Sequence, residues 1–273
     1  MDYKKYMEDF LLCLHSEEKS EATIRKYMND VSSFIEYVND KEISKEVVIA
    51  YKKELSEIYK PRTVNVKIIA VNRFLKYIGR NDCVVKTMKI QRQIFINEDK
   101  QISMEEYKRL LQADDTRTVN IIKTIAATGI RVSELKHITV EAVNNKQAKI
   151  MLKGKNRIIL IPDTLQKQLL EYIEENKIET GPIFISKNGK PLDRSNIWRD
   201  MKKLCAKTNI PESKVYPHNL RHLFARTFYE EEKDIVRLAD ILGHSSIETT
   251  RIYTMETGKK HSEVLDKIAA MML

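Results

Sequence analysis

The sequence predicts a mainly helical fold that contains one small β-hairpin. Three observations support this prediction. Glycine and proline, the residues that break helices, number only 7 and 6 among 273 residues. Apolar residues recur at helical spacing along most of the chain. Only the segments 147–152 and 157–161 are rich in β-forming residues, and they flank a short turn at 153–156.

The first part of the chain is expected to form four helices. Apolar residues at helical spacing predict a helix over 3–16 and another over about 45–58. Between them, Ser20 is a good N-cap for a helix whose apolar face runs from Ile24 to Val38. Pro61 suits the first turn of a fourth helix, which ends near Gly79.

The fourth helix carries basic residues opposite its apolar stripe, and no carboxylate occurs from residue 60 to residue 80. A solvated helix face usually mixes both signs of charge, so we interpret this face as a phosphate contact. Residues 81–97 lose clear periodicity and are also basic; they predict either a linker that follows a DNA backbone or a plain tether. The predicted DNA-binding residues are Arg62, Arg73, Lys76, Arg80, Lys86, Lys89 and Arg92.

We place a first domain at residues 1–92, a linker at 93–98 and a second domain at 99–273. Ser103 and Glu106 form a capping-box pattern at the start of a helix that runs through Leu111. A helix over 117–127 and a short one over 131–137 are expected before the hairpin. Further helices are expected at 163–176, 193–207, 217–230, 234–242, 246–252 and 260–272.

Charge and cysteine usage restrict the class of protein. The net charge of +9 suits a polyanionic partner. The three cysteines are far apart and odd in number, so they predict neither a disulfide framework nor a metal site and favour a reducing cytoplasm. Neither a signal peptide nor a long apolar stretch occurs, which predicts a soluble protein without a membrane segment.

The segment HNLRH, residues 218–222, is the first candidate for chemistry. His218 and Arg221 are three residues apart on a predicted helix, so both side chains lie on the same face. Arginine can bind two phosphate oxygens at once, and histidine can bind the same phosphate or accept a proton. His218 and His222 also have the spacing of two zinc ligands. That alternative lacks the glutamate of a metalloprotease helix, and Arg221 would repel the cation, so we interpret His222 as a packing residue.

Two other segments could complete a site. In LGHSSIETTRIYT, residues 242–254, Gly243 permits a turn, His244 follows it, and Tyr253 lies about two turns into the next helix. A tyrosine can attack phosphorus reversibly because its phenolate is a tolerable leaving group. In ATGIRVSEL, residues 127–135, Arg131 follows a glycine break, and Glu134 could hold Arg131 or a neighbouring histidine.

Four ordered strings of the second domain, ATGIRVSEL, KGKNR, HNLRHLFA and LGHSSIETTRIYT, together resemble the tyrosine recombinase (phage-integrase-type) family. In the first domain, SEATIRKYMNDVSSFIEYV is similar to the family's helical core-binding domain. The resemblance covers nearly all of the chain and is far more specific than a single short motif. It implies an N-terminal four-helix, SAM-like, DNA-binding domain followed by a mixed, mostly helical catalytic domain.

The resemblance assigns a role to each candidate residue. It implies that Arg131 and Arg221 bind the scissile phosphate, and that Glu134 supports the site. Tyr253 would attack phosphorus and leave a 3′-phosphotyrosyl bond with a free 5′ hydroxyl. His218 would take part in proton transfer with the tyrosine, and His244 would donate a hydrogen bond to a phosphate oxygen. Lys153 would protonate the 5′ oxygen. Lys155 is an alternative to Lys153.

The implied function is a site-specific recombinase or integrase that uses no metal and no nucleotide cofactor; the phosphate-binding pattern GxxxxGK[ST] is absent from the sequence. The implied partners are double-stranded DNA and further copies of the chain, arranged as a tetramer on which the helix 260–272 is exchanged. A helix that closes its own core is the alternative for 260–272. Two alternative functions are relaxation of supercoils by a type IB topoisomerase-like enzyme and DNA-binding regulation by an inactive relative. Simple, Xer-like sites are expected, since the chain leaves no room for an arm-binding domain. A mobile element is the expected context, and a phage, an integrative transposon, a plasmid and a chromosome dimer stay open as the element served.

Overall fold

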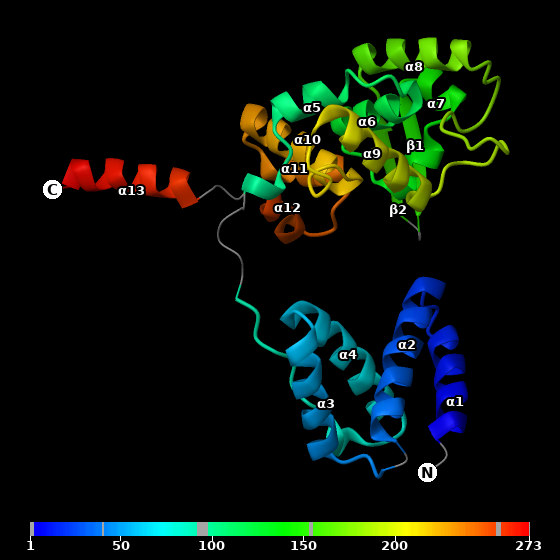
Figure 1. The fold of residues 1–273 in the computed structure, drawn as a ribbon, viewed down its shortest axis with the longest axis vertical. Coiled ribbons are helices and arrows are strands. Elements are labelled where there is room, and N and C mark those ends of the chain that lie inside the picture. The colour runs from blue at the N-terminus through cyan, green and yellow to red at the C-terminus, as the bar shows by residue number, and fades with distance from the viewer. Residues whose placement is uncertain (1–2, 40, 92–97, 153–154, 255–257, 273) are drawn as a thin grey trace. The chain divides into compact units, whose positions relative to one another are not determined.

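The computed structural model describes residues 3–39, 41–91, 98–152, 155–254 and 258–272. The chain divides into two compact units, residues 1–92 and 93–273, each with its own core. Helices dominate both units, and the only sheet in the described part of the chain is a two-stranded hairpin. The predicted fold class is therefore confirmed (Figure 1).

Within its described residues, the first unit contains four α-helices and a short 3₁₀ helix: α1 (Tyr3–Ser16), α2 (Glu21–Val38), α3 (Lys45–Ile58), α4 (Pro61–Tyr77) and η1 (Asn81–Cys83). Local sequence explains where they begin. The Ser20 hydroxyl accepts a hydrogen bond from the backbone N–H of Thr23, and Ser44 caps α3 in the same way. Pro61 occupies the first turn of α4, where a missing N–H has no cost. Fully buried Phe34, Val71 and Phe74 help hold the helices together.

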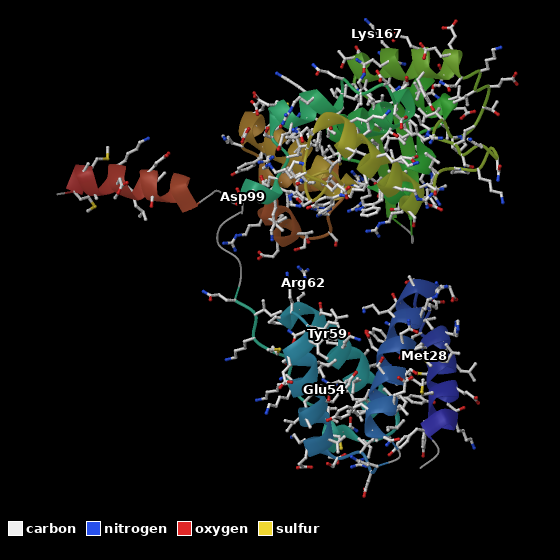
Figure 2. All side chains as sticks on the ribbon, in the orientation of Figure 1. Met28, Glu54, Tyr59, Arg62, Asp99 and Lys167 are labelled. Carbon is white, nitrogen blue, oxygen red and sulfur yellow. The ribbon has the colours of Figure 1, made fainter. Side chains whose placement is uncertain are left out.

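The basic face of α4 differs from the prediction, because carboxylates from other parts of the unit reach it. Arg73 forms an ion pair with Glu17, and Arg80 lies 3.2 Å from Asp82. The expectation of a face with one sign of charge is therefore wrong for these two arginines. Arg62 remains exposed at the N-terminal end of α4, as Figure 2 shows. Lys76, Lys86 and Lys89 are also exposed, and Arg92 lies outside the described residues.

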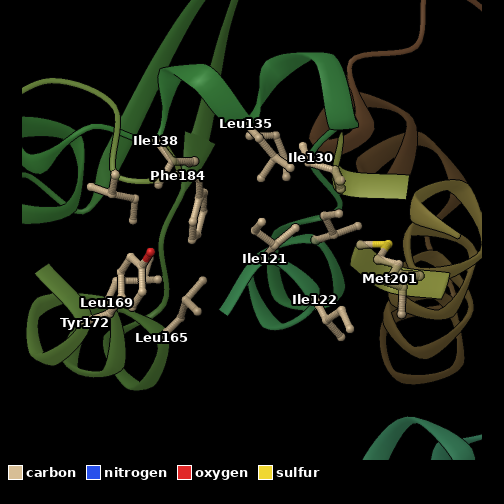
Figure 3. Close-up of a cluster of buried hydrophobic side chains, with 14 of the residues drawn as sticks. Ile121, Ile122, Ile130, Leu135, Ile138, Leu165, Leu169, Tyr172, Phe184 and Met201 are labelled. Carbon is tan, nitrogen blue, oxygen red and sulfur yellow. The ribbon is translucent and has the colours of Figure 1, made fainter. Parts of the chain in front are cut away.

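The second unit is built around α6 (Thr116–Thr128), which packs against three other helices, α8 (Asp163–Glu175), α9 (Arg194–Thr208) and α10 (Pro217–Glu232). Ile121 and Ile122 of α6 are fully buried between Leu169 of α8 and Met201 of α9 (Figure 3). The structure further describes in this unit η2 (Glu98–Lys100), α5 (Met104–Leu110), η3 (Val132–His137), α7 (Val140–Asn144), β1 (Gln147–Leu152), β2 (Lys155–Leu160), α11 (Ile235–Leu242), α12 (Ile247–Thr254) and α13 (Gly258–Met272).

Most predicted element boundaries lie within one or two residues of the observed ones, and the predicted capping box is confirmed. The Ser103 hydroxyl accepts from the N–H of Glu106, and the Glu106 carboxylate accepts from the N–H of Ser103. The hairpin prediction is wrong in one respect. Antiparallel pairing extends to Leu152 and Lys155, so the predicted turn over 153–156 is too long. None of the helices in the described ranges is both long and apolar enough to span a bilayer.

Candidate active site

Helix ends and tight turns place the candidate side chains. Gly129 ends α6 in the left-handed conformation (φ +62°), which lets Arg131 follow directly as the N-cap of η3. A second left-handed glycine, Gly243 (φ +62°), ends α11 and precedes His244. Tyr253 lies near the end of α12, which packs against α10 and α11.

Arg131, His218 and Arg221 line one cleft of about 510 Å³. His218 and Arg221 come from consecutive turns of α10, and Arg131 comes from the start of η3. The other lining residues are Ile130, Val132, Ser133, Arg194, Trp198, Tyr216 and Pro217. Two guanidinium groups and an imidazole that face one cavity suit an anion with several oxygen atoms.

A buried carboxylate orients Arg131. Glu134 is only 1% exposed, and its Oε1 accepts a hydrogen bond from Arg131 Nη1 at 2.9 Å. The other oxygen, Oε2, accepts from the backbone N–H of Arg131 and from Nη1 of Arg157, each at 3.0 Å. Glu134 therefore fixes two arginines at once. The predicted partner of Glu134 was Arg131 or a histidine, and Arg157 was not expected.

Three arginines converge on the C-terminal end of α11. Arg157 Nη2 donates to the carbonyl oxygen of Ile241 at 2.7 Å, Arg221 Nη2 to that of Leu242 at 2.8 Å, and Arg131 Nη2 to that of Gly243 at 3.2 Å. The last carbonyls of a helix lack helical partners and carry partial negative charge, so cations are stabilised there. Arg221 also donates to the carbonyl oxygen of Gly129. The arginines are thus tied to the turn that leads into His244.

His244 joins this network through both ring nitrogens. Its Nε2 lies 3.0 Å from Arg221 Nη2 and accepts the hydrogen bond, because a guanidinium only donates. Its Nδ1 lies 2.9 Å from the hydroxyl of Thr250, a fully buried residue. Burial lowers the pKa of His244 to about 4, and the charges of Arg221, Arg131 and Arg157 contribute to this decrease. The imidazole is therefore neutral at physiological pH.

The ring of Tyr253 is 4% exposed and lies among Ala225, Leu238 and Leu242. It stacks on His244 with ring centroids 5.9 Å apart and planes 14° apart. The rings of His222 and Tyr253 pack edge to face, with their centroids 4.5 Å apart. The phenol thus lies in an apolar pocket but borders two imidazoles.

The electrostatic environment of Arg221 connects Tyr253 to the cleft. Burial and the neighbouring Arg131 lower the pKa of the Arg221 guanidinium, whereas Tyr253 and Glu134 raise it. Burial also lowers the pKa of His222 to about 4, and partial desolvation with the charges of Arg221 and Arg131 lowers that of His218. The ring centroids of His218 and His222 are 4.6 Å apart, so His222 touches both His218 and Tyr253.

The structure thus brings five of the predicted chemical residues together with Glu134: Arg131, His218, Arg221, His244 and Tyr253. Lys153 lies outside the described residues, as does the side chain of Lys155. Arg157 and Thr250 were missed by sequence reasoning. Both occur inside the strings that carry the resemblance, KGKNR and LGHSSIETTRIYT, but their spacing alone gave no indication of a role. No group of three or more potential metal ligands occurs among the described residues.

The fold and this site define a class: a two-unit helical protein that presents arginines and neutral histidines beside a tyrosine, the groups needed for phosphoryl transfer to a phenol. A model of the phage integrase family matches residues 100–260, and a model of the phage integrase N-terminal SAM-like domain matches residues 7–81. The chain belongs to the phage integrase family. The resemblance predicted from the four strings is confirmed.

Individual relatives agree with this assignment. The tyrosine recombinase XerA of Pyrococcus furiosus is 30% identical over 96% of this chain and 93% of the relative. A crystal structure of XerA recombinase covers 97% of this chain and 98% of its own, with 28% identity and a TM-score of 0.54. The match to a lambda integrase dimer bound to a COC′ core site covers 92% of this chain and 76% of the integrase chain, with a TM-score of 0.74. At 15% identity this match shows a likeness of fold.

Proposed function

We propose that this chain is a site-specific recombinase that cleaves and rejoins DNA strands through a covalent bond between Tyr253 and a 3′ phosphate. The observation that carries the proposal is the path of direct contacts from the cleft to the phenol. Arg131 and Arg221 line the cleft, Arg221 is hydrogen-bonded to His244, and His244 stacks on Tyr253. XerA, to which the chain is similar, is a tyrosine recombinase by name, and lambda integrase, which shares the fold, is an integrase by name.

In the proposed reaction a DNA phosphate enters the cleft and is bound by Arg131 and Arg221. The Tyr253 oxygen attacks phosphorus and loses its proton, the bond from phosphorus to the 5′ oxygen breaks, and a 3′-phosphotyrosyl ester forms. The two guanidinium groups neutralise the charge that builds on phosphorus, which metal ions do in many nucleases. A DNA hydroxyl reverses the reaction, and since the ester conserves the bond energy, rejoining needs no nucleotide.

Neutral histidines suit the proton transfers. The lowered pKa of His218 favours a ring that can accept a proton at physiological pH. His222 packs edge-on against both rings and so supports the orientation of His218 and Tyr253. For the leaving 5′ oxygen we assign Lys153 as the acid, with Lys155 as the alternative.

His244 is proposed to donate a hydrogen bond to a phosphate oxygen. It accepts from Arg221 at Nε2 and therefore carries its proton on Nδ1 in this structure. The Thr250 hydroxyl can accept from Nδ1 or donate to it, so it accommodates either tautomer. A phosphate that draws Arg221 away would free Nε2 to carry the proton and donate.

We assign residues 1–92 as the DNA-binding unit, 93–98 as a linker and 99–273 as the catalytic unit. Within the first unit, the exposed basic residues Arg62, Lys76, Lys86 and Lys89 are proposed to contact phosphates, and Arg92 is included from the sequence. Arg73 and Arg80 would have to exchange a carboxylate for a phosphate. We further propose a tetramer on synapsed DNA, located in the cytoplasm with the nucleoid and serving a mobile element.

Covalent capture tests the proposal. Purified protein is incubated with sheared DNA of its host in EDTA, denatured, and the protein-linked DNA is recovered and sequenced. We expect one enriched site, adducts that persist in EDTA, and none with Tyr253→Phe. Paired copies of that site should yield recombinant product. Topoisomers without recombinants would favour the topoisomerase alternative, and adducts that need a divalent metal would contradict the proposed mechanism.

A further inference from the structure

Arg157 contacts the site without lining the cleft. It lies on β2 opposite Ile150, and its side chain is only 11% exposed. One Nη group donates to Glu134 and the other to the carbonyl oxygen of Ile241, at 3.0 and 2.7 Å. A guanidinium so enclosed does not line the cleft, so it acts on the site through these two partners and through its charge.

The first partner, Glu134, holds Arg131. Its two oxygens are divided: Oε1 accepts from the Arg131 guanidinium, and Oε2 accepts from Arg157 and the Arg131 backbone. A carboxylate this deeply buried requires charged or hydrogen-bonding partners. Without Arg157, we expect Oε2 to accept a second hydrogen bond from the Arg131 guanidinium, which would then turn from the cleft toward Glu134.

The second partner is the end of α11, which leads into His244. Arg157, Arg221 and Arg131 donate to three successive carbonyls there, those of Ile241, Leu242 and Gly243. The Arg157 side chain also lies against Gly243: a Cβ added at Gly243 would lie 2.5 Å from Arg157 Cδ. Arg157 thus joins the hairpin, Glu134 and this turn in one buried contact.

We propose that Arg157 is a positioning residue for strand cleavage: it holds Glu134, and through it Arg131, in fixed relation to the turn that carries His244. The inference rests on the proposed function. Beyond that function, a residue on the hairpin is assigned the alignment of Arg131, the arginine proposed to bind phosphate. Displacements of about 1 Å in such an alignment can slow a reaction ~100-fold.

Arg117 offers a matched control. It too bridges a carboxylate and a backbone carbonyl in the same unit: Nη2 donates to Asp200 at 3.0 Å and Nη1 to the Ile185 oxygen at 3.3 Å. It does not line the cleft. Arg117→Gln and Arg157→Gln therefore remove similar interactions, but only the second touches Glu134.

The test is the single-turnover rate of adduct formation on a nicked duplex carrying the captured site, at saturating protein, with the folded fraction measured for each variant. We expect Arg157→Gln to lower the rate constant at least ~10-fold while DNA affinity stays near wild type, and Arg117→Gln to leave it unchanged. In the Glu134→Gln background, Arg157→Gln should slow cleavage little further, because both changes remove the same alignment.

A wild-type rate for Arg157→Gln, or an equal loss for Arg117→Gln, would overturn the inference. So would full additivity with Glu134→Gln. If Arg157→Gln does not fold, Arg157→Lys decides: it keeps the charge but cannot span both acceptors, so its rate must still fall about 10-fold. A wild-type protein that forms no adduct would instead refute the proposed function.

A second substrate separates Arg157 from the lysine of the hairpin. With sulfur in place of the bridging 5′ oxygen, the leaving group needs no proton. This substrate should rescue Lys153→Ala but not Arg157→Gln. Rescue of Arg157→Gln would mean that Arg157 serves the leaving group and would overturn its assignment to Arg131.

Discussion

At the scale of single residues, Arg221 links the cleft to two helix ends and to His244. It binds the carbonyls of Gly129 and Leu242 and contacts His244. Replacing it with lysine keeps a charge but loses the planar fork. We predict that Arg221→Lys and Arg131→Ala each lower adduct formation at least ~100-fold, as the loss of a preorganised donor does elsewhere.

Arg237→Ala is the control for these variants, because Arg237 forms an exposed ion pair with Glu232 on the surface. It should form adducts at the wild-type rate. Rates within a few-fold of wild type for Arg221→Lys would contradict the role of its fork. The measurement is the same single-turnover assay, normalised to folded protein.

The buried histidines make stability depend on pH. Burial lowers the pKa of His222 and of His244 from 6.5 to about 4. Between those pH values the unfolded chain binds protons that the folded chain excludes, so stability present above pH 6.5 is lost as the pH falls toward 4. We predict that the thermal unfolding midpoint falls over this range.

Variants isolate this effect from the titration of carboxylates. His222→Asn and His244→Asn should each flatten the pH dependence of the midpoint, whereas His15→Asn, on the surface of α1, should not. Imidazole proton resonances measure the two pKa values directly. A midpoint pH dependence identical in all four proteins would contradict the predicted burial.

Sequence reasoning selected side chains that the structure brings together, and it missed two residues that contact them, Arg157 and Thr250. Arg131, His218, Arg221, His244 and Tyr253 stand in strings whose order resembles a family, and the structure brings them together. Arg157 meets Glu134 across 23 positions and Ile241 across 84. Such contacts depend on tertiary packing, which local spacing does not encode. Glu17, which forms an ion pair with Arg73 across 56 positions, was missed for the same reason.

At the scale of elements, helix caps explain why boundaries were predictable. Ser20, Ser44 and Ser103 each bind the N–H groups that open their helices. The five-residue helix α7 was not predicted, because so short a segment shows no periodicity. The hairpin turn was overestimated, since Lys155 and Asn156 are not β-forming residues but pair with β1 nonetheless.

Gly243 links an element boundary to the site. Its φ of +62° is left-handed, and a Cβ there would meet Arg157. We predict that Gly243→Ala costs roughly 1–2 kcal/mol of backbone strain. It should also displace Arg157 and slow adduct formation about 10-fold.

Gly189→Ala separates strain from displacement. Gly189 has a similar φ of +71°, but nothing lies within 4 Å of the added Cβ. Its variant should lose comparable backbone stability in a denaturant titration and keep the wild-type cleavage rate. Equal cleavage rates in the two alanine variants would show that the contact with Arg157 is irrelevant to the reaction.

At the scale of the whole molecule, α13 presents an apolar surface that no other part of the described chain covers. Every described side chain from Ser262 to Met272 is exposed, including Val264, Leu265, Ile268 and Met271. These residues recur at helical spacing and form one stripe. An exposed stripe of this kind marks an interaction surface, and a neighbouring copy is its proposed partner.

We predict that Leu265→Asp with Ile268→Asp reduces the size of the complex on DNA, measured by sedimentation, while binding of one copy to a half-site persists. Leu160→Asp is the matched control, because Leu160 is 71% exposed and Leu265 64%. It should assemble as wild type does. Unchanged complexes in the α13 variant would contradict exchange of this helix.

The most direct test of the central claim is to identify the atom that holds the DNA. Adducts formed on the captured site are digested with protease and nuclease, and the modified peptide is sequenced by mass spectrometry. We predict a nucleotide linked through its 3′ phosphate to the oxygen of Tyr253. A linkage to any other residue, or adducts of normal yield from Tyr253→Phe, would contradict the account.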